Sequence, residues 1–97
     1  MRVIAKKILR EFWEKHADSE EQLKTWYKEA SKASWGSPTD IKEEYAKASI
    51  LKGGRVVFDI YGNKYRLVVD INYLRKWLFI RFIGTHTEYD KIDANTI

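Results

Sequence analysis

The chain has 97 residues, of which 44% are hydrophobic and 14% aromatic, so we expect one domain over residues 1–97. It has no cysteine and only two, widely separated histidines, which excludes disulfides and cysteine zinc sites and argues against a histidine-rich metal site. No hydrophobic run approaches the roughly 20 residues of a membrane span, and the basic start lacks the apolar core of a secretory signal. We therefore expect a cytoplasmic protein with no membrane partner.

The N-terminal third is predicted to form two helices joined as an antiparallel hairpin. Asp18 or Ser19 would cap the second helix, with Glu21 in a pattern close to a capping box. Such amphipathic helices usually pack against a sheet. Their apolar stripes are Ile4, Ile8, Leu9 and Phe12 in the first, and Leu23, Trp26, Tyr27 and Ala30 in the second.

The segment 34–45 interrupts this helical pattern. Ser37 and Pro38 are typical of an N-cap and a first helical position, which predicts a single short turn through Ile41 and Tyr45. Trp35 can either stack on a nucleobase or fill a gap between the helices and the sheet, and the second interpretation is favoured for a loop tryptophan.

Beyond residue 47 the apolar period changes to two, which is typical of strands. Gly53-Gly54 and Gly62-Asn63 mark tight turns between them. The sequence thus predicts an α+β fold, with two N-terminal helices on an antiparallel sheet of about four strands and a short helical turn near Tyr89. The predicted strands cover residues 48–51, 55–61, 64–71 and 76–83.

Alternation along these strands separates two faces. The first is continuously apolar and should pack under the helices: Val56, Phe58, Ile60, Tyr65, Leu67, Val69, Ile71, Leu78, Ile80 and Phe82. The second, expected to be uncovered, mixes apolar and charged residues: Arg55, Val57, Asp59, Lys64, Arg66, Val68, Asp70, Phe79, Arg81 and Ile83. Its arginines either form ordinary cross-strand pairs with Asp59 and Asp70 or bind phosphate.

Positive charge is concentrated in the same region. The net charge is +4, and residues 49–86 carry seven basic residues against only Asp59 and Asp70. Such a field favours a polyanionic partner, RNA or DNA before membrane. We expect Lys52, Arg55, Arg75 and Lys76 to contribute to RNA binding.

The segment after the last predicted strand carries further reactive side chains. His86 follows Gly84-Thr85, and an imidazole can donate or accept a proton near neutral pH. Tyr89 can stack on a base or bind phosphate. A lone histidine is more often a surface or capping residue, and Tyr89 can simply pack a helical turn, so both interpretations stay open at this point.

Three stretches resemble the HigB family of toxin–antitoxin mRNA interferases, within the RelE/YoeB-like superfamily. They are RVVFDI at 55–60, GNKYRLVV at 62–69 and IRFIGTHTEYDKI at 80–92. The resemblance extends over essentially the whole chain and implies a RelE-like fold. It also implies an endoribonuclease that needs no metal or other cofactor and that cuts mRNA, commonly in the ribosomal A site. The implied partner is a helix-turn-helix antitoxin.

The resemblance also implies roles for single residues. Arg66 matches the strand arginine placed at the scissile phosphate, and His86 matches the position of the general acid. Arg81 would join Arg66 on phosphate, Lys64 would orient the 2′-hydroxyl or add positive charge, and Tyr89 would stack or assist proton transfer. The glutamate that the YoeB-like branch carries in its second strand is absent here, which leaves Asp59 as the nearest acidic candidate for a base.

Two other functions fit the same residues. A non-catalytic RNA-binding module would use the same basic face without cleavage, and a protein-interaction domain would need neither RNA nor the imidazole. Toxicity of the chain expressed alone, abolished by Arg66→Ala or His86→Gln, would separate the enzyme from both.

Overall fold

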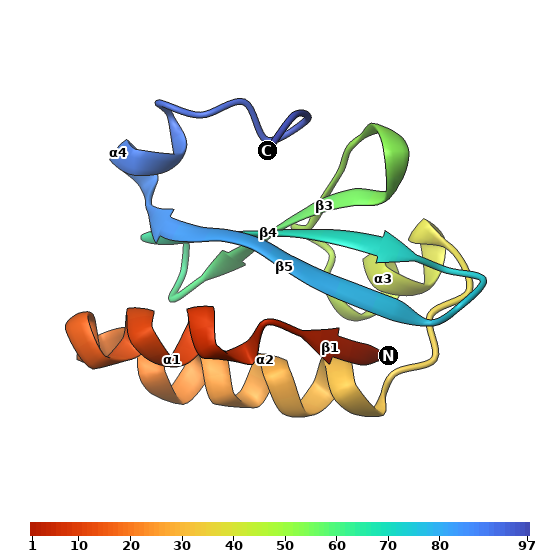
Figure 1. Ribbon diagram of the computed structural model, residues 1–97, viewed down its shortest axis with the longest axis horizontal. Coiled ribbons are helices and arrows are strands. Elements are labelled where there is room, and N and C mark those ends of the chain that lie inside the picture. The colour runs from red at the N-terminus through yellow and green to blue at the C-terminus, as the bar shows by residue number, and fades with distance from the viewer.

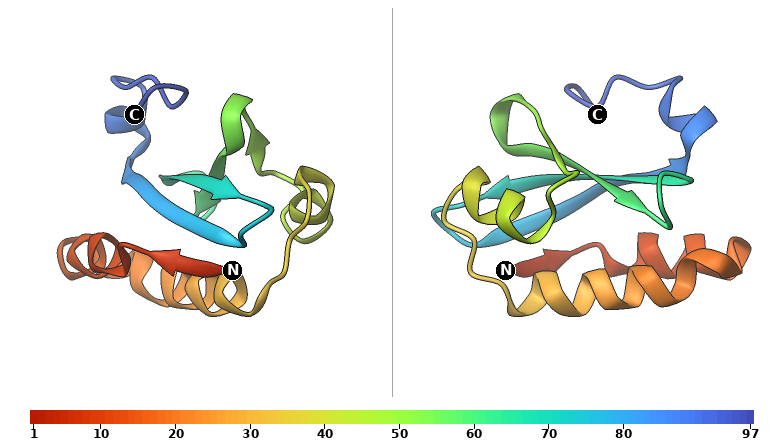
Figure 2. Two further views of the ribbon diagram at one scale, coloured as in Figure 1. Left: turned by 45° about the vertical axis from the view of Figure 1, so that its right-hand side comes forward. Right: turned by 180° about the vertical axis from the view of Figure 1, so that it is seen from behind.

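The computed structural model describes all 97 residues as helices layered on one sheet (Figures 1 and 2). The sheet has five strands in the order β1-β5-β4-β3-β2, with β1 parallel to β5 and the other neighbours antiparallel. In chain order the elements are β1 (Arg2–Ile4), α1 (Lys6–Lys15), α2 (Glu20–Lys32), α3 (Pro38–Glu44), β2 (Ser49–Ile50), β3 (Arg55–Ile60), β4 (Tyr65–Asn72), β5 (Trp77–Thr85) and α4 (His86–Tyr89). The predicted α+β class, helical hairpin and C-terminal helical turn are confirmed.

The N-terminal residues differ from the prediction, which placed Ile4 in the first helix. Arg2–Ile4 instead form a fifth strand, in parallel register with Trp77–Phe79, and the Arg2 N–H donates to the Lys76 carbonyl over 2.7 Å. Ala5, with a φ of 77°, makes the break between this strand and α1. The apolar spacing suits either structure, and the open edge of β5 supplies the hydrogen bonds that favour a strand.

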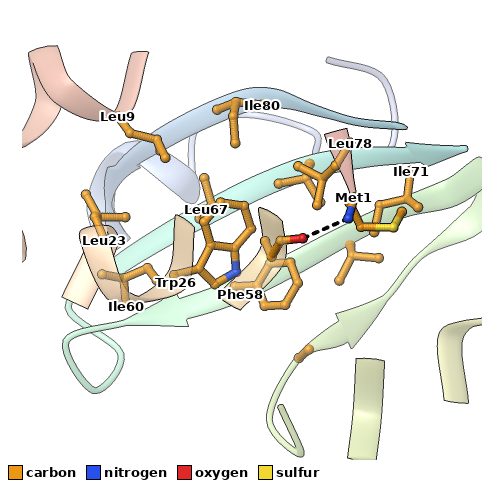
Figure 3. Packing of buried hydrophobic residues seen from close by; sticks show 14 of the residues in the cluster. Met1, Leu9, Leu23, Trp26, Phe58, Ile60, Leu67, Ile71, Leu78 and Ile80 are labelled. Atoms are coloured by element: carbon orange, nitrogen blue, oxygen red, sulfur yellow. Dashed lines mark hydrogen bonds between the residues drawn. The ribbon is translucent and has the colours of Figure 1, made fainter. Parts of the chain in front are cut away.

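The two long helices and α3 cover one face of the sheet and enclose the main core. In Figure 3, Trp26 and Leu23 of α2 and Leu9 of α1 lie against the buried side chains of β3, β4 and β5. Trp35 is 2% exposed and stacks on Phe58, so the prediction that it fills a gap is confirmed.

The start of α2 does not use the predicted cap. A 3₁₀ turn at Ala17–Ser19 precedes the helix, and no side chain caps it. The Ser19 hydroxyl donates to the carbonyl of His16 over 2.7 Å. The Asp18 carboxylate accepts hydrogen bonds from Lys64 and Tyr65, both at 2.5 Å, and therefore joins the helical hairpin to β4.

A β-bulge changes the predicted faces near the end of β5. Val68 is opposite Phe82 while Val69 is opposite Ile80, so Arg81 has no partner in β4. An extra residue reverses the alternation beyond it. Phe82 therefore packs on the second face and Ile83 against the main core, the reverse of their predicted positions.

The second face is also less open than predicted. Residues 86–97 form α4 and a tail that runs over it, on the side of the sheet away from α1 and α2 (Figure 1). Ala94 of the tail is buried against Val57 and Val68, and Ile97 and Tyr89 pack beside them as a small second core. None of the helices combines the length and the apolar character that crossing a bilayer requires.

Candidate nuclease site

Arg66 lies near the start of the central strand β4 on the second face, in a pair with Asp59 from the neighbouring strand. The two residues are opposite each other in β3 and β4, and Arg66 Nη1 is 3.2 Å from Asp59 Oδ1. Only 18% of the Arg66 side chain is exposed, and its buried Nε–H has no partner within the protein. A guanidinium has five N–H groups, so this pairing orients the group and leaves donors for a phosphate.

Tyr89 joins Arg66 from above the sheet. Its ring centroid lies 5.5 Å from the guanidinium carbon of Arg66, within the range of a cation–π contact. The ring also packs on the small second core. Tyr89 therefore supports Arg66 in a fixed position, and the expected structural and functional interpretations of this residue are compatible.

His86 is positioned by a capping box at the start of α4. The Thr85 hydroxyl accepts from the Glu88 N–H over 3.1 Å, and Glu88 accepts from the Thr85 N–H over 2.8 Å. The hydrogen bond from the Thr85 backbone lowers the pKa of Glu88, so the carboxylate stays ionised in this role. The His86 N–H itself donates to the carbonyl of Lys64 over 3.1 Å, which fixes α4 to the start of β4.

The imidazole of His86 has one nitrogen engaged. Nδ1 lies 3.0 Å from Asp90 Oδ2, and about half of the side chain is exposed. An ionised carboxylate only accepts hydrogen bonds, so Nδ1 carries a proton and Nε2 is left for another molecule. The sequence prediction missed Asp90 as a partner, although its spacing of four residues from His86 on a helical turn is the signal that identifies it.

A second group of charges lies beside the first, between Arg55, Asp70 and Arg81. Asp70 Oδ2 is 2.8 Å from Arg55 Nη1 and 3.2 Å from Arg81 Nη2. Arg55 also donates to the carbonyl of Ile97 in the tail. Cross-strand pairs of arginines with Asp59 and Asp70, one of the two expected alternatives for this face, are thus present, and 42% of the Arg81 side chain is exposed.

Lys64 is not brought to Arg66. Its ammonium group binds Asp18 at 2.5 Å, toward the helical hairpin, and this hydrogen bond is the main reason why the pKa of Asp18 lies below its ordinary value. Lys64 contributes to the site through its backbone carbonyl, which holds His86.

The other three predicted RNA-binding residues lie apart from His86. Lys52 is in the 3₁₀ turn between β2 and β3. Arg75 and Lys76 are in the β4–β5 turn, at the end of the sheet opposite α4 (Figure 1). The Lys76 ammonium group donates to the carbonyl of Trp35 over 3.0 Å and so is partly engaged within the protein.

Comparisons with known proteins give a matching family and a similar protein. Residues 19–92 match the HigB toxin family, described as the RelE-like toxic component of a toxin–antitoxin system. The chain is also similar to a protein of Escherichia coli O6:H1 (strain CFT073) named mRNA interferase HigB. The two are 26% identical over 94 residues, which cover 95% of this chain and 91% of the relative.

Proposed function

The chain belongs to the HigB family, the RelE-like toxic component of a toxin–antitoxin system, and on that premise we propose that it is a metal-independent endoribonuclease that cleaves mRNA. The observation that carries the proposal is the contact of Arg66 with Tyr89, whose short helix α4 also carries His86. These side chains suit phosphate binding and proton transfer, the two tasks that RNA cleavage requires.

The proposed reaction is an in-line attack by a 2′-hydroxyl on the adjacent phosphorus. The bond from O2′ to phosphorus forms as the O2′ proton passes to solvent water, the bond to O5′ breaks, and the products are a 2′,3′-cyclic phosphate and a 5′-hydroxyl. Arg66 stabilises the additional negative charge of the transition state through its free N–H groups. Arg81, exposed at the bulge, adds a second contact to the RNA backbone.

His86 supplies the proton to the leaving O5′ from Nε2. The Asp90 carboxylate accepts a hydrogen bond from Nδ1, which orients the ring and stabilises the protonated imidazole. Asp59 is engaged by Arg66, so its role in the proposal is to hold the guanidinium. Lys64 holds the backbone of His86 through its carbonyl, while its ammonium group is paired with Asp18.

Within the cell we propose that the substrate is mRNA in the ribosomal A site and that a helix-turn-helix antitoxin inhibits the enzyme. A cytoplasmic location is part of the same proposal, because translating ribosomes are found there. Arg55 and Lys52, with Arg75 and Lys76, extend the positive charge that attracts RNA beyond the scissile phosphate.

The test is expression of the toxin alone, with Arg66→Ala and His86→Gln as variants. Each should abolish growth arrest and RNA cleavage while thermal unfolding remains cooperative. Arg10→Ala and His16→Gln are matched controls, because they remove the same side chains from the helical hairpin, and both should stay toxic. If both site variants remained fully toxic, the proposed site would be wrong.

The products give a second test. An RNA with a 2′-deoxy nucleotide at the cleavage position should resist the wild-type protein, since the attacking hydroxyl is absent. Cleavage of that substrate would contradict the mechanism even if the protein proved to be a nuclease.

A further inference from the structure

Two aromatic side chains near the start of β5 have no role in either core. Trp77 and Phe79 are only partly buried, and neither belongs to the main core or packs against the second one. Their rings meet edge to face, with centroids 6.2 Å apart. The other three tryptophans of the chain, Trp13, Trp26 and Trp35, are all buried. A partly exposed aromatic pair on a sheet surface indicates an interaction site.

Guanidinium groups lie at both ends of this pair. The guanidinium carbon of Arg75 is 5.3 Å from the Trp77 ring centroid, and that of Arg81 is 5.5 Å from the Phe79 ring centroid. In the parallel β1–β5 pairing Arg2 is opposite Trp77, so it lies on the same face, and its side chain is exposed. We call Arg75, Trp77, Phe79 and Arg81 the aromatic platform.

The platform lies on the same face of the sheet as the candidate nuclease site. Phe79 is opposite Asp70, which binds Arg55 and Arg81 on the second face. Five residues further along β5, Gly84 is opposite Arg66. A strand rises by about 3.3 Å per residue, so Phe79 and the position opposite Arg66 are roughly 16 Å apart along β5. A strand of RNA held at Arg66 reaches the platform within a few nucleotides.

Single-stranded RNA is bound by this combination of side chains. Bases stack on aromatic rings, and arginine contacts the phosphates between them or stacks on the bases itself. A shallow hollow beside Phe79, bounded also by Gly53, Asn72 and Tyr73, offers room for the edge of a stacked base. A double helix would hide the faces of its bases from such a platform.

From these observations we infer that Trp77 and Phe79 form a second RNA-binding site, which stacks unpaired bases of the substrate several nucleotides away from the scissile phosphate. The inference rests on the proposed function in taking RNA as the ligand, and it adds a site for bases to a site for phosphate. Arg75 and Arg81 bind the backbone on either side of the stacked bases.

The test uses a single-stranded 2′-O-methyl RNA of mixed sequence, which the enzyme has no free 2′-hydroxyl to cleave. The matched probe is an abasic oligonucleotide of equal length, with the same phosphates but no bases. Wild-type protein should bind the first more tightly than the second. Trp77→Ala with Phe79→Ala should weaken binding of the base-carrying oligonucleotide by about 10- to 100-fold and leave binding of the abasic one unchanged.

Three further variants make the result specific. Leu74→Ala removes a side chain that is 92% exposed in the adjacent turn, and affinity should not change. Trp77→Phe with Phe79→Tyr keeps stacking surfaces and should keep affinity. Because Trp77 is the one tryptophan that is not buried, the oligonucleotide should quench its fluorescence in the wild type, and Trp77→Phe should remove that signal.

Several outcomes would overturn the inference. Unchanged RNA affinity of Trp77→Ala with Phe79→Ala would do so, as would an equal loss for the abasic probe, because then stacking is not involved. Loss of antitoxin binding with RNA affinity intact would assign the platform to a protein partner instead. The proposed function is tested by a different measurement, the cleavage of RNA. Arg66→Ala should end cleavage yet keep the preference for binding base-carrying RNA.

Discussion

Apolar side chains are buried on both faces of the sheet, but their surroundings differ between the two faces. On the face toward α1 and α2, side chains such as Leu67, Leu78 and Val56 are fully buried among other apolar groups. On the other face, Val57 and Val68 are equally buried, but arginine–aspartate pairs surround them and a short tail covers them.

This difference indicates where function lies. Partly buried charges are retained at a free-energy cost that apolar residues of the same volume would avoid. The Nε groups of Arg55 and Arg66 on the second face are buried without a partner, and so is Trp26 Nε1 on the helix-covered face. What distinguishes the second face is therefore its partly buried arginine–aspartate pairs, and this is the face that we propose binds the substrate.

The largest predicted effect is a loss of stability on the helix-covered face. Leu67→Ala should lower the free energy of unfolding by about 2–5 kcal/mol, because it removes a fully buried side chain and leaves a cavity. Urea denaturation measures the change. Leu74→Ala, a leucine that is 92% exposed, should stay within about 0.5 kcal/mol of the wild type. Equal losses in the two variants would contradict the assignment of this core.

The next effect is on activity and comes from the second face. Arg66→Lys keeps the charge beside Asp59 but removes the planar fork, so RNA cleavage should fall by about 10- to 100-fold with little change in stability. Arg10→Lys on α1 is the matched control and should cleave at the wild-type rate. A wild-type rate for Arg66→Lys would mean that simple charge is enough at this position.

A smaller effect is expected in the tail that covers the second face. Ala94→Asp puts a carboxylate against Val57 and Val68, and the tail should undock rather than bury that charge. The loss of global stability should therefore stay near 1–2 kcal/mol, while amide exchange in residues 90–97 becomes much faster. Lys91→Gln, at an exposed residue of the same tail with no side-chain hydrogen bond, should change neither quantity.

The smallest effect concerns the hydrogen bonds that join the two layers at Asp18. Since its pKa in the folded protein lies below the ordinary value of 3.8, its contribution to stability is complete above that pH and is lost as the pH falls through the folded pKa. Asp18→Asn should be less stable than the wild type at neutral pH, and the difference should shrink in acid.

Unfolding measured across the acid range checks this, with Glu21→Gln as an exposed carboxylate that has no hydrogen-bond partner. A gap between wild type and Asp18→Asn that widened below pH 3.8 would contradict the assigned direction.

Local patterns in the sequence were sufficient to predict the main helices and strands and the face of the sheet on which Arg66 lies. Alternation along 55–60 and 65–72 identifies the buried face, because a strand exposes successive side chains on opposite sides. The same alternation places Arg66 and Asp59 on one face, where pairing with an aspartate was one of the two alternatives for the arginines. The resemblance carried by residues 80–92 singled out His86, and the spacing of Ser37 and Pro38 predicted α3.

Only the tertiary structure decided the remaining features, because they depend on residues far apart in the chain. Arg2–Ile4 form a strand because β5 offers an open edge, and Lys64 turns to Asp18 because the helical hairpin brings that carboxylate to it. The bulge at Arg81 moves Phe82 to the second face, where it is partly buried against the second core. A single inserted residue reverses every later side chain, so strand alternation alone had assigned Phe82 and Ile83 to the wrong faces.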